Sequence, residues 1–322
     1  MDQPGGEFDL IARYFTRPAR GAVLGVGDDC ALLAPAAGMQ LAVAADMLVE
    51  GRHFFAGTDP EALGHKALAV NLSDLAAMGA QPWAFLLALA LPDADASWLG
   101  AFSAGLFALA DAHGIELVGG DTTRGPRNLC ITVLGQLPAG QALRRDAARA
   151  GDELWVSGVP GEARLALGHL RGEWSLEPAA REQVLPRLER PTPRVALGLA
   201  LRGIAHAAID VSDGLLGDLG HVLRASAVGA EVLADALPRG RVLGQQPEAL
   251  RRACQLAGGD DYELLFSAPA ARRAEVLSAA ADCGVQVSRI GSMGGEPGLR
   301  LLDAAGRSID TVFPSFDHFA SP

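Results

Sequence analysis

The side chains best suited to chemistry are aspartates that recur beside short apolar runs. They stand in four turns, at residues 27–29, 119–121, 210–213 and 258–261. Glycine and aspartate are also ordinary turn residues, so a single turn of this kind is more typical of a solvated loop than of a metal site. Adjacent carboxylates tolerate burial only when positive charge lies between them. The recurrence of the pattern therefore favours bound cations.

The elements predicted around these acids are strands and one buried helix. Four acids end or follow an apolar run that predicts a strand: Asp29, Asp46, Asp121 and Asp210. Asp74 instead lies on a helix predicted over residues 61–78, three positions after Asn71, so the two polar side chains share one helix face. A structural hydrogen bond is the alternative role for Asp74.

Oxygen ligands drawn from distant segments select a hard cation, above all Mg²⁺. The candidate carboxylates, which no cluster of histidine or cysteine accompanies, are Asp28, Asp29, Asp46, Asp74, Asp121, Asp210 and Asp213. Magnesium in turn implies a phosphate ligand. The sequence has neither the G-x-x-x-x-G-K-[ST] loop nor the kinase glycine loop with H-R-D, and it lacks the dinucleotide fingerprint. Residues 119–124 and 212–214 could cradle phosphate through amides and hydroxyls instead.

The composition indicates a globular protein and argues against several other classes of protein. A chain of 322 residues with 49% hydrophobic and 20% charged residues suits two globular domains. The net charge of -11 and the absence of a long basic run argue against a nucleic-acid partner. The four cysteines are far apart, which argues against zinc and disulfides. No signal peptide or spanning segment is predicted, so we expect a cytoplasmic protein without a membrane partner.

Six segments together resemble the motifs of the thiamine-monophosphate kinase family, in that family's order. They are GVGDDCA at 25–31, DMLVEGRHF at 46–54, KALAVNLSDLAAMGA at 66–80, GGDTTRG at 119–125, DVSDGLL at 210–216 and GGDDYEL at 258–264. The resemblance implies an enzyme that phosphorylates thiamine monophosphate to thiamine diphosphate, with ATP as co-substrate and several Mg²⁺ ions as cofactors.

The resemblance also implies the architecture of the aminoimidazole ribonucleotide synthetase superfamily. That architecture is α+β with two domains: an N-terminal α+β domain whose sheet dimerises into a β-barrel, and a C-terminal α/β domain. We therefore expect a homodimer. Residues 1–140 are expected to bind ATP and Mg²⁺ and to dimerise, and residues 141–322 to complete the active site.

The positions that match the family's motifs imply three sets of site residues. The metal set is Asp29, Asp46, Asp74, Asp121, Asp210 and Asp213. The ATP set is Gly120, Asp121, Arg145 and Ser212. The substrate set is His53, Asp260 and Phe316. Two positions depart from the family: Ala44-Ala45 stand where it often has Ser-Thr, and Asp260 stands where it often has Glu. Neither departure removes a required carboxylate.

No catalytic general base is expected, because the acceptor phosphate oxygen is largely ionised near neutral pH. We predict direct transfer without a phosphorylated enzyme. Two alternatives stay open: another ATP-using synthetase of the superfamily, such as an aminoimidazole ribonucleotide or selenophosphate synthetase, and a nucleotide-binding sensor without catalysis. The single early cysteine, Cys30, lies inside the acidic motif, and the presence of Asp46 and Asp121 argues against the sensor.

Overall fold

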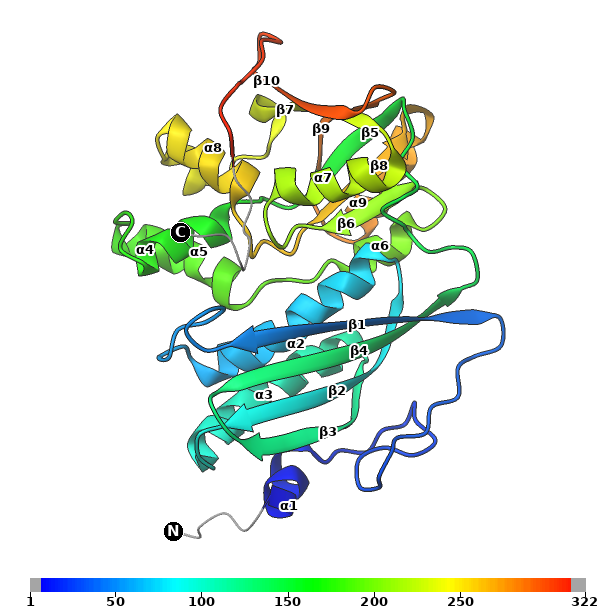
Figure 1. Cartoon of the computed structure of the whole chain (residues 1–322), viewed down its shortest axis with the longest axis vertical. Helices are drawn as coiled ribbons and strands as arrows, with labels where there is room; N and C mark the ends of the chain where they lie inside the picture. Colours follow the sequence, from blue (N-terminus) through cyan, green and yellow to red (C-terminus); the bar gives the residue numbers. More distant parts are fainter. Residues whose placement is uncertain (1–6, 314–322) are drawn as a thin grey trace. The chain divides into compact units, whose positions relative to one another are not determined.

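A computed structural model describes residues 7–313 (Figure 1). The described chain forms two compact units, each with its own sheet. Unit 1 comprises the residues up to Leu75 together with Ala80–Gly140, and unit 2 comprises Ala76–Gly79 and the residues from Gln141 onward. Within residues 7–313, no helix has the length and apolar character that crossing a bilayer requires.

Unit 1 is a four-stranded sheet with helices. Its elements are α1 (Glu7–Leu10), η1 (Ile11–Phe15), β1 (Met39–Val49), α2 (Pro60–Ala77), β2 (Gln81–Leu91), α3 (Ala96–His113), β3 (Glu116–Arg124) and β4 (Asn128–Pro138). The strand order is β1-β4-β2-β3. β4 pairs antiparallel with both β1 and β2, and β3 pairs parallel with β2.

One face of this sheet is covered and the other is open. Along β4, Leu129, Ile131 and Val133 are buried, whereas the residues between them are partly exposed. Figure 1 shows α2 and α3 running along one face of the sheet. The open face instead exposes large apolar side chains: Leu41 (45% exposed), Val43 (61%), Met47 (54%) and Leu86 (37%).

Two glycines let α2 and α3 lie in close contact. A Cβ atom at Gly64 would lie 2.1 Å from the Phe102 carbonyl oxygen, and one at Gly105 would lie 1.9 Å from the Glu61 carbonyl oxygen. Any larger residue would force the helices apart. The close packing fixes α2, the helix that carries Asn71 and Asp74.

Unit 2 is built on a six-stranded mixed sheet. Its strands are β5 (Asp152–Ser157), β6 (Ala207–Asp210), β7 (Gly229–Leu233), β8 (Leu264–Pro269), β9 (Val287–Gly294) and β10 (Gly298–Leu302). Its helices are α4 (Glu162–Leu170), α5 (Pro178–Glu189), α6 (Val195–Leu201), α7 (Leu215–Ser226), α8 (Glu248–Ala257) and α9 (Arg273–Asp282), with short helical turns η2 (Ala234–Ala236), η3 (Leu243–Gln245) and η4 (Ala270–Arg272).

The strand order in unit 2 is β10-β7-β9-β5-β8-β6, and only the β10–β7 pair is parallel. The expected C-terminal α/β domain is therefore α+β in its strand pairing. The apolar face of α7, with Leu215, Leu219 and Val222, packs into one buried cluster with residues of the sheet such as Val156 and Ile209. This packing fixes the turn between β6 and α7.

The predicted strand ends at Asp29, Asp46 and Asp121 are wrong. The segment before Asp29 forms only isolated bridges, Leu24 with Leu32 and Val26 with Asp28, and no strand. β1 continues through Asp46, which pairs with Ile131, and β3 continues through Asp121, which pairs with Ala88. Both strands extend because their backbones find partners in the neighbouring strand, whatever the charge of the side chain. Asp210, in contrast, is the last residue of β6, as predicted.

Candidate active site

Asp28, Asp29 and Asp121 line one hollow of about 1050 Å³ in unit 1. Its remaining wall comes from η1, from the segment around Cys30, and from the open face of the sheet. Asp29 and Asp121 are both exposed, so their carboxylates are accessible to a ligand. The first two acidic turns of the sequence thus come together around a single space.

Gly120 allows β3 to run tightly beside β2 at this hollow. Its φ is 152°, in the region that favours glycine. A Cβ atom there would lie 1.9 Å from the Leu87 carbonyl oxygen. Glycine is therefore required by the backbone next to Asp121.

Asp46 is tied to the helix that carries Asp74. The Asp46 amide donates a hydrogen bond of 3.0 Å to Asn71 Oδ1, while Asn71 Nδ2 donates to the Ala67 carbonyl oxygen at 3.0 Å. β1 is an edge strand, so Asn71 satisfies an amide that has no neighbouring strand on that side. Asn71 is 1% exposed, and Asp46 and Asp74 are half-buried. Asn71 thus positions Asp46 beside α2.

Asp46 and Asp121 belong to the same sheet, but their side chains do not come together there. Asp46 lies in the row that runs through Ile131, Leu87 and Gly120, whereas Asp121 lies in the next row, with Ala88 and Cys130. Adjacent rows point to opposite faces, and β1 and β3 are separated by three strand spacings of about 4.8 Å each. Asp46 therefore faces the helices, and Asp121 faces the open side.

His53 has a defined tautomer. Its Nδ1 accepts a hydrogen bond of 3.0 Å from the Val49 amide. In a neutral imidazole this places the proton on Nε2. His53 is half-buried at the end of β1, where Nε2–H could donate to an anionic ligand.

The two acidic segments of unit 2 are locked together by their backbones. The Asp260 amide donates to the Ser212 carbonyl oxygen, and the Tyr262 amide donates to that of Val211, each at 2.8 Å. A Cβ atom at Gly259 would lie 2.4 Å from the Ser212 carbonyl oxygen. The structure therefore brings Ser212, and with it Asp210 and Asp213, next to Asp260.

Asp218 braces the turn that follows β6. Its Oδ2 accepts hydrogen bonds from the amides of Ser212 (3.1 Å), Asp213 (3.1 Å) and Gly214 (3.2 Å). These amides are engaged by a carboxylate, so the amide part of the phosphate cradle predicted at residues 212–214 is wrong, whereas the part assigned to the Ser212 hydroxyl stays a prediction. Burial, together with the charges of Asp210 and Asp213, raises the pKa of Asp218 to about 7 against the effect of the amides. A cation at Asp210 and Asp213 would favour the ionised form.

A buried ion pair braces the second acidic segment. Arg194 Nε and one terminal nitrogen donate to the two oxygens of Glu263 at 2.6 and 2.5 Å, and Ser157 Oγ donates to Glu263 at 2.5 Å. The side chains of Arg194 and Glu263 are 14% and 6% exposed. The Glu263 carbonyl oxygen accepts from the Val211 amide at 2.8 Å, so this pair also supports the β6 turn.

Replacing Arg194 with methionine should destabilise the protein by about 3–5 kcal/mol, because it leaves the Glu263 carboxylate buried without its cation. Urea unfolding would measure the loss. The matched control is Arg272→Met, which breaks an exposed pair with Glu275 and should leave the unfolding midpoint close to that of the wild type. Equal midpoints for the two variants would contradict the role of the buried pair.

Arg145 and Asp213 both lie close enough to His221 of α7 to affect its charge. Burial lowers the pKa of His221, the cations Arg224 and Arg145 lower it further, and Asp213 opposes them. Arg145 is exposed, and its carbonyl oxygen accepts from Ser226 Oγ at 2.8 Å. The predicted ATP residue Arg145 and the predicted metal residue Asp213 therefore share one neighbourhood.

The oxygen ligands of this site fit Mg²⁺ better than a metal ion whose ligands all come from protein side chains. In the described part of the chain, no three His, Cys, Asp or Glu side chains gather closely enough to enclose an ion. Mg²⁺ usually retains several waters and binds one or two carboxylates together with substrate phosphates. The oxygen ligands offered separately by residues 28–29, Asp121 and Asp210 suit that mode of binding.

Three residues that brace the acidic segments were not predicted from the sequence: Arg194, Asp218 and Glu263. For Asp218 a signal was present, because an acid in the first turn of a helix commonly interacts with free amides. The predicted substrate residue Phe316 lies outside the described residues.

The AIR synthase related protein family matches in two parts, its N-terminal domain at residues 27–137 and its C-terminal domain at residues 149–304. The curated thiamine-monophosphate kinase of Salmonella typhimurium is 45% identical over 98% of this chain and 99% of its own length. The chain belongs to the thiamine-monophosphate kinase family. All six predicted metal ligands of this family member lie in the two matched parts.

Solved structures of the thiamine-monophosphate kinase family share the fold. The crystal structure from Stenotrophomonas maltophilia K279a is 48% identical and matches with a TM-score of 0.84 over 93% of this chain and 95% of that one. AaThiL complexed with AMPPCP and TMP is 28% identical, with a TM-score of 0.77 over 89% of each chain.

Proposed function

We propose that this protein transfers the γ-phosphoryl group of ATP to thiamine monophosphate, forming thiamine diphosphate. The observation that carries the proposal is the near full-length identity to thiamine-monophosphate kinases, in a chain that keeps every predicted metal-binding carboxylate. A structural relative binds AMPPCP, a non-hydrolysable ATP analogue, together with TMP. Nothing in the described site requires another chemistry.

Magnesium would be held by Asp29, Asp46, Asp74, Asp121, Asp210 and Asp213. When bound, it would neutralise the repulsion between two polyanionic phosphates and align the reacting oxygens. Each unit supplies its own acids: residues 1–140 provide the hollow with Asp29 and Asp121, and residues 141–322 provide the braced turn with Asp210 and Asp213.

Nucleotide and substrate contacts are assigned to separate residues. Gly120, Asp121, Arg145 and Ser212 would bind ATP. His53, Asp260 and Phe316 would bind thiamine monophosphate, and the Nε2 proton of His53 suits a phosphate oxygen. The acceptor oxygen is already ionised, so no side chain needs to remove a proton from it. The residues therefore act by binding and orientation, and transfer is direct.

We propose that the protein forms a homodimer through the open face of the unit 1 sheet. Leu41, Val43 and Met47 of β1 and Leu86 of β2 are exposed on one side of a sheet, which is costly for an isolated chain. Pairing two four-stranded sheets face to face would bury them and close a barrel. The Asp121 hollow opens on the same face, so dimerisation would also shield it from solvent.

Val43→Arg should convert the dimer into a monomer, because it places an unpaired charge in the middle of the buried apolar face. Analytical ultracentrifugation would measure the mass. Val312→Arg is the matched control, since Val312 is 84% exposed and lies outside unit 1. Loss of the dimer in the control, or its retention in Val43→Arg, would contradict the assignment of this face.

A substrate comparison tests the proposed activity. The purified protein is incubated with ATP and Mg²⁺ and with either thiamine monophosphate or free thiamine, and the products are separated by chromatography. Thiamine diphosphate should form from the monophosphate alone. ATP turnover only with another acceptor would favour a different synthetase of the superfamily, and nucleotide binding without turnover would favour a sensor.

A further inference from the structure

The loop over residues 258–262 holds a strained backbone at the predicted substrate residue. Asp260 has a φ of 67° and Tyr262 a φ of 51°, and both lie in the left-handed region. Such conformations are uncommon for residues other than glycine, particularly for tyrosine, and persist only where surrounding contacts hold them. Tyr262 Oη also donates to Asp260 Oδ1 at 3.2 Å. The direction of the Asp260 carboxylate therefore depends on this conformation.

Asp261, between the two strained residues, is anchored to another element. Its Oδ1 and Oδ2 lie 2.8 and 2.7 Å from the Gly161 amide nitrogen, which donates to them at the start of α4. A carboxylate is favoured there because the first amides of a helix have no partner within the helix. Burial raises the pKa of Asp261 well above its usual range, and the Gly161 and Ala163 amides oppose that rise. The contact holds the loop against α4.

The turn that carries Ser212 has separate support. Asp218 accepts its three amides, and Asp210 at its start pairs with Leu264 in β8. Loss of the Asp261 anchor would therefore leave the predicted nucleotide side held, while Asp260 would keep its bonds to Ser212 and Tyr262 and could relax from its left-handed conformation. The two sides of the site should respond differently to the same substitution.

We propose that Asp261 is a positioning residue for thiamine monophosphate: its contact with the Gly161 amide holds Asp260 in the conformation that binds the substrate. The proposal rests on the proposed function, because it takes Asp260 to be a substrate contact. In this proposal Asp261 acts through Asp260 and makes no contact of its own with substrate or metal.

The test is a double-mutant cycle read out as KM and kcat. Asp261→Ala should raise the KM for thiamine monophosphate about tenfold, as is typical for loss of an outer-shell contact, with the KM for ATP changed by less than about twofold. Asp261→Asn keeps one oxygen that can accept from Gly161 and should recover most of the loss. On an Asp260→Ala background, adding Asp261→Ala should change the KM for thiamine monophosphate by less than about twofold.

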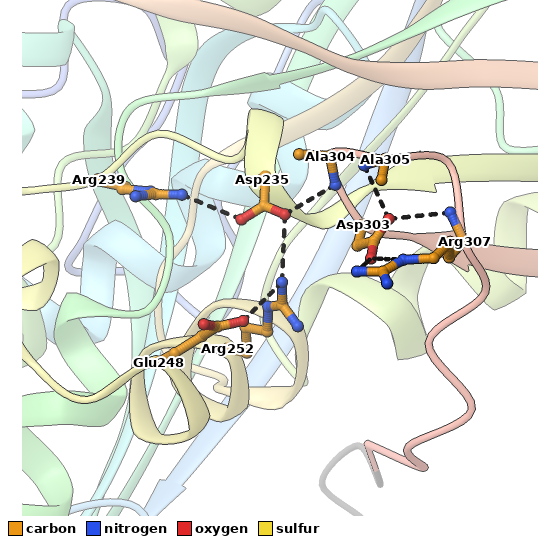
Figure 2. Close-up of polar contacts among 8 residues, drawn as sticks. All are labelled: Asp235, Arg239, Glu248, Arg252, Asp303, Ala304, Ala305 and Arg307. Atoms are coloured by element: carbon orange, nitrogen blue, oxygen red, sulfur yellow. Dashed lines mark hydrogen bonds and ion pairs between the residues drawn. The ribbon is translucent and has the colours of Figure 1, made fainter.

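Asp303→Ala is the matched control. Figure 2 shows its carboxylate accepting from the amides of Ala305 and Arg307, each at 2.9 Å, in the turn after β10. It removes the same kind of carboxylate–amide anchor outside the acidic loops and should leave both KM values unchanged.

Each outcome bears on the proposal. An unchanged KM for thiamine monophosphate in Asp261→Ala, an equal rise in both KM values, or a full effect on the Asp260→Ala background would overturn it. If Asp261→Ala does not fold, Asp261→Asn is used in its place, with about a threefold rise expected that vanishes on the Asp260→Ala background. A wild-type protein that forms no thiamine diphosphate would instead refute the proposed function, which separates the two failures.

Discussion

Asp121→Asn should lower kcat by about a thousandfold while leaving the fold intact. The substitution preserves size and removes the negative charge that is proposed to bind Mg²⁺. Asp121 is exposed on the open face of the sheet, so its carboxylate has no part in the apolar core. Steady-state kinetics at saturating ATP and thiamine monophosphate would give kcat, and circular dichroism would report the fold.

The control for this prediction is Asp111→Asn. Asp111 lies on α3, where its side chain is 64% exposed and pairs with Arg17 on the surface. The control should retain the kcat of the wild type. A near-normal kcat for Asp121→Asn would remove Asp121 from the metal site, and an equal loss in both variants would show that the effect is not specific to the hollow.

Gly120→Ala should destabilise the protein by more than about 3 kcal/mol and abolish activity. The new Cβ atom would lie 1.9 Å from the Leu87 carbonyl oxygen, and relief of that clash requires β3 to move away from β2. Alanine is also strained at a φ of 152°. Urea unfolding monitored by fluorescence or circular dichroism would measure the change.

Gly125→Ala provides the comparison, one residue beyond the end of the same strand. Its Cβ atom would lie 3.6 Å from Ala90 Cβ, an ordinary van der Waals contact, and its φ is not in the left-handed region. We expect a stability within about 0.5 kcal/mol of the wild type. Similar unfolding midpoints for the two variants would contradict the requirement for glycine at position 120.

Local patterns predicted much of the fold. The apolar segment with a proline start predicts a helix over 61–78, and α2 spans Pro60–Ala77. Strand ends are predicted less well, because an aspartate interrupts the apolar pattern of a strand without ending the strand itself. β1 passes through Asp46 since the backbone there is satisfied from both sides, by Asn71 and by the ladder with β4. Side-chain charge alone does not end a strand whose amides have partners.

The sequence predicts which residues belong to the candidate site, but it predicts their arrangement in space less well. The motifs named Asp29, Asp121, Asp210 and Asp260, and the structure gathers them into a hollow in unit 1 and a braced pair of loops in unit 2. The braces could not be read from the sequence: Arg194 and Glu263 are far apart along the chain, and their pairing depends on how α6 and β8 fold together. Long-range contacts of this kind leave no local pattern.

The reaction proposed for this site is direct phosphoryl transfer from ATP to thiamine monophosphate. A rapid-quench single turnover with excess enzyme, Mg²⁺, thiamine monophosphate and γ-³²P-labelled ATP tests it most directly. The label should pass from ATP to thiamine diphosphate at one rate, with none bound to protein at any time, and EDTA should stop the transfer. Transiently labelled protein, or labelled inorganic phosphate without labelled thiamine diphosphate, would contradict the account.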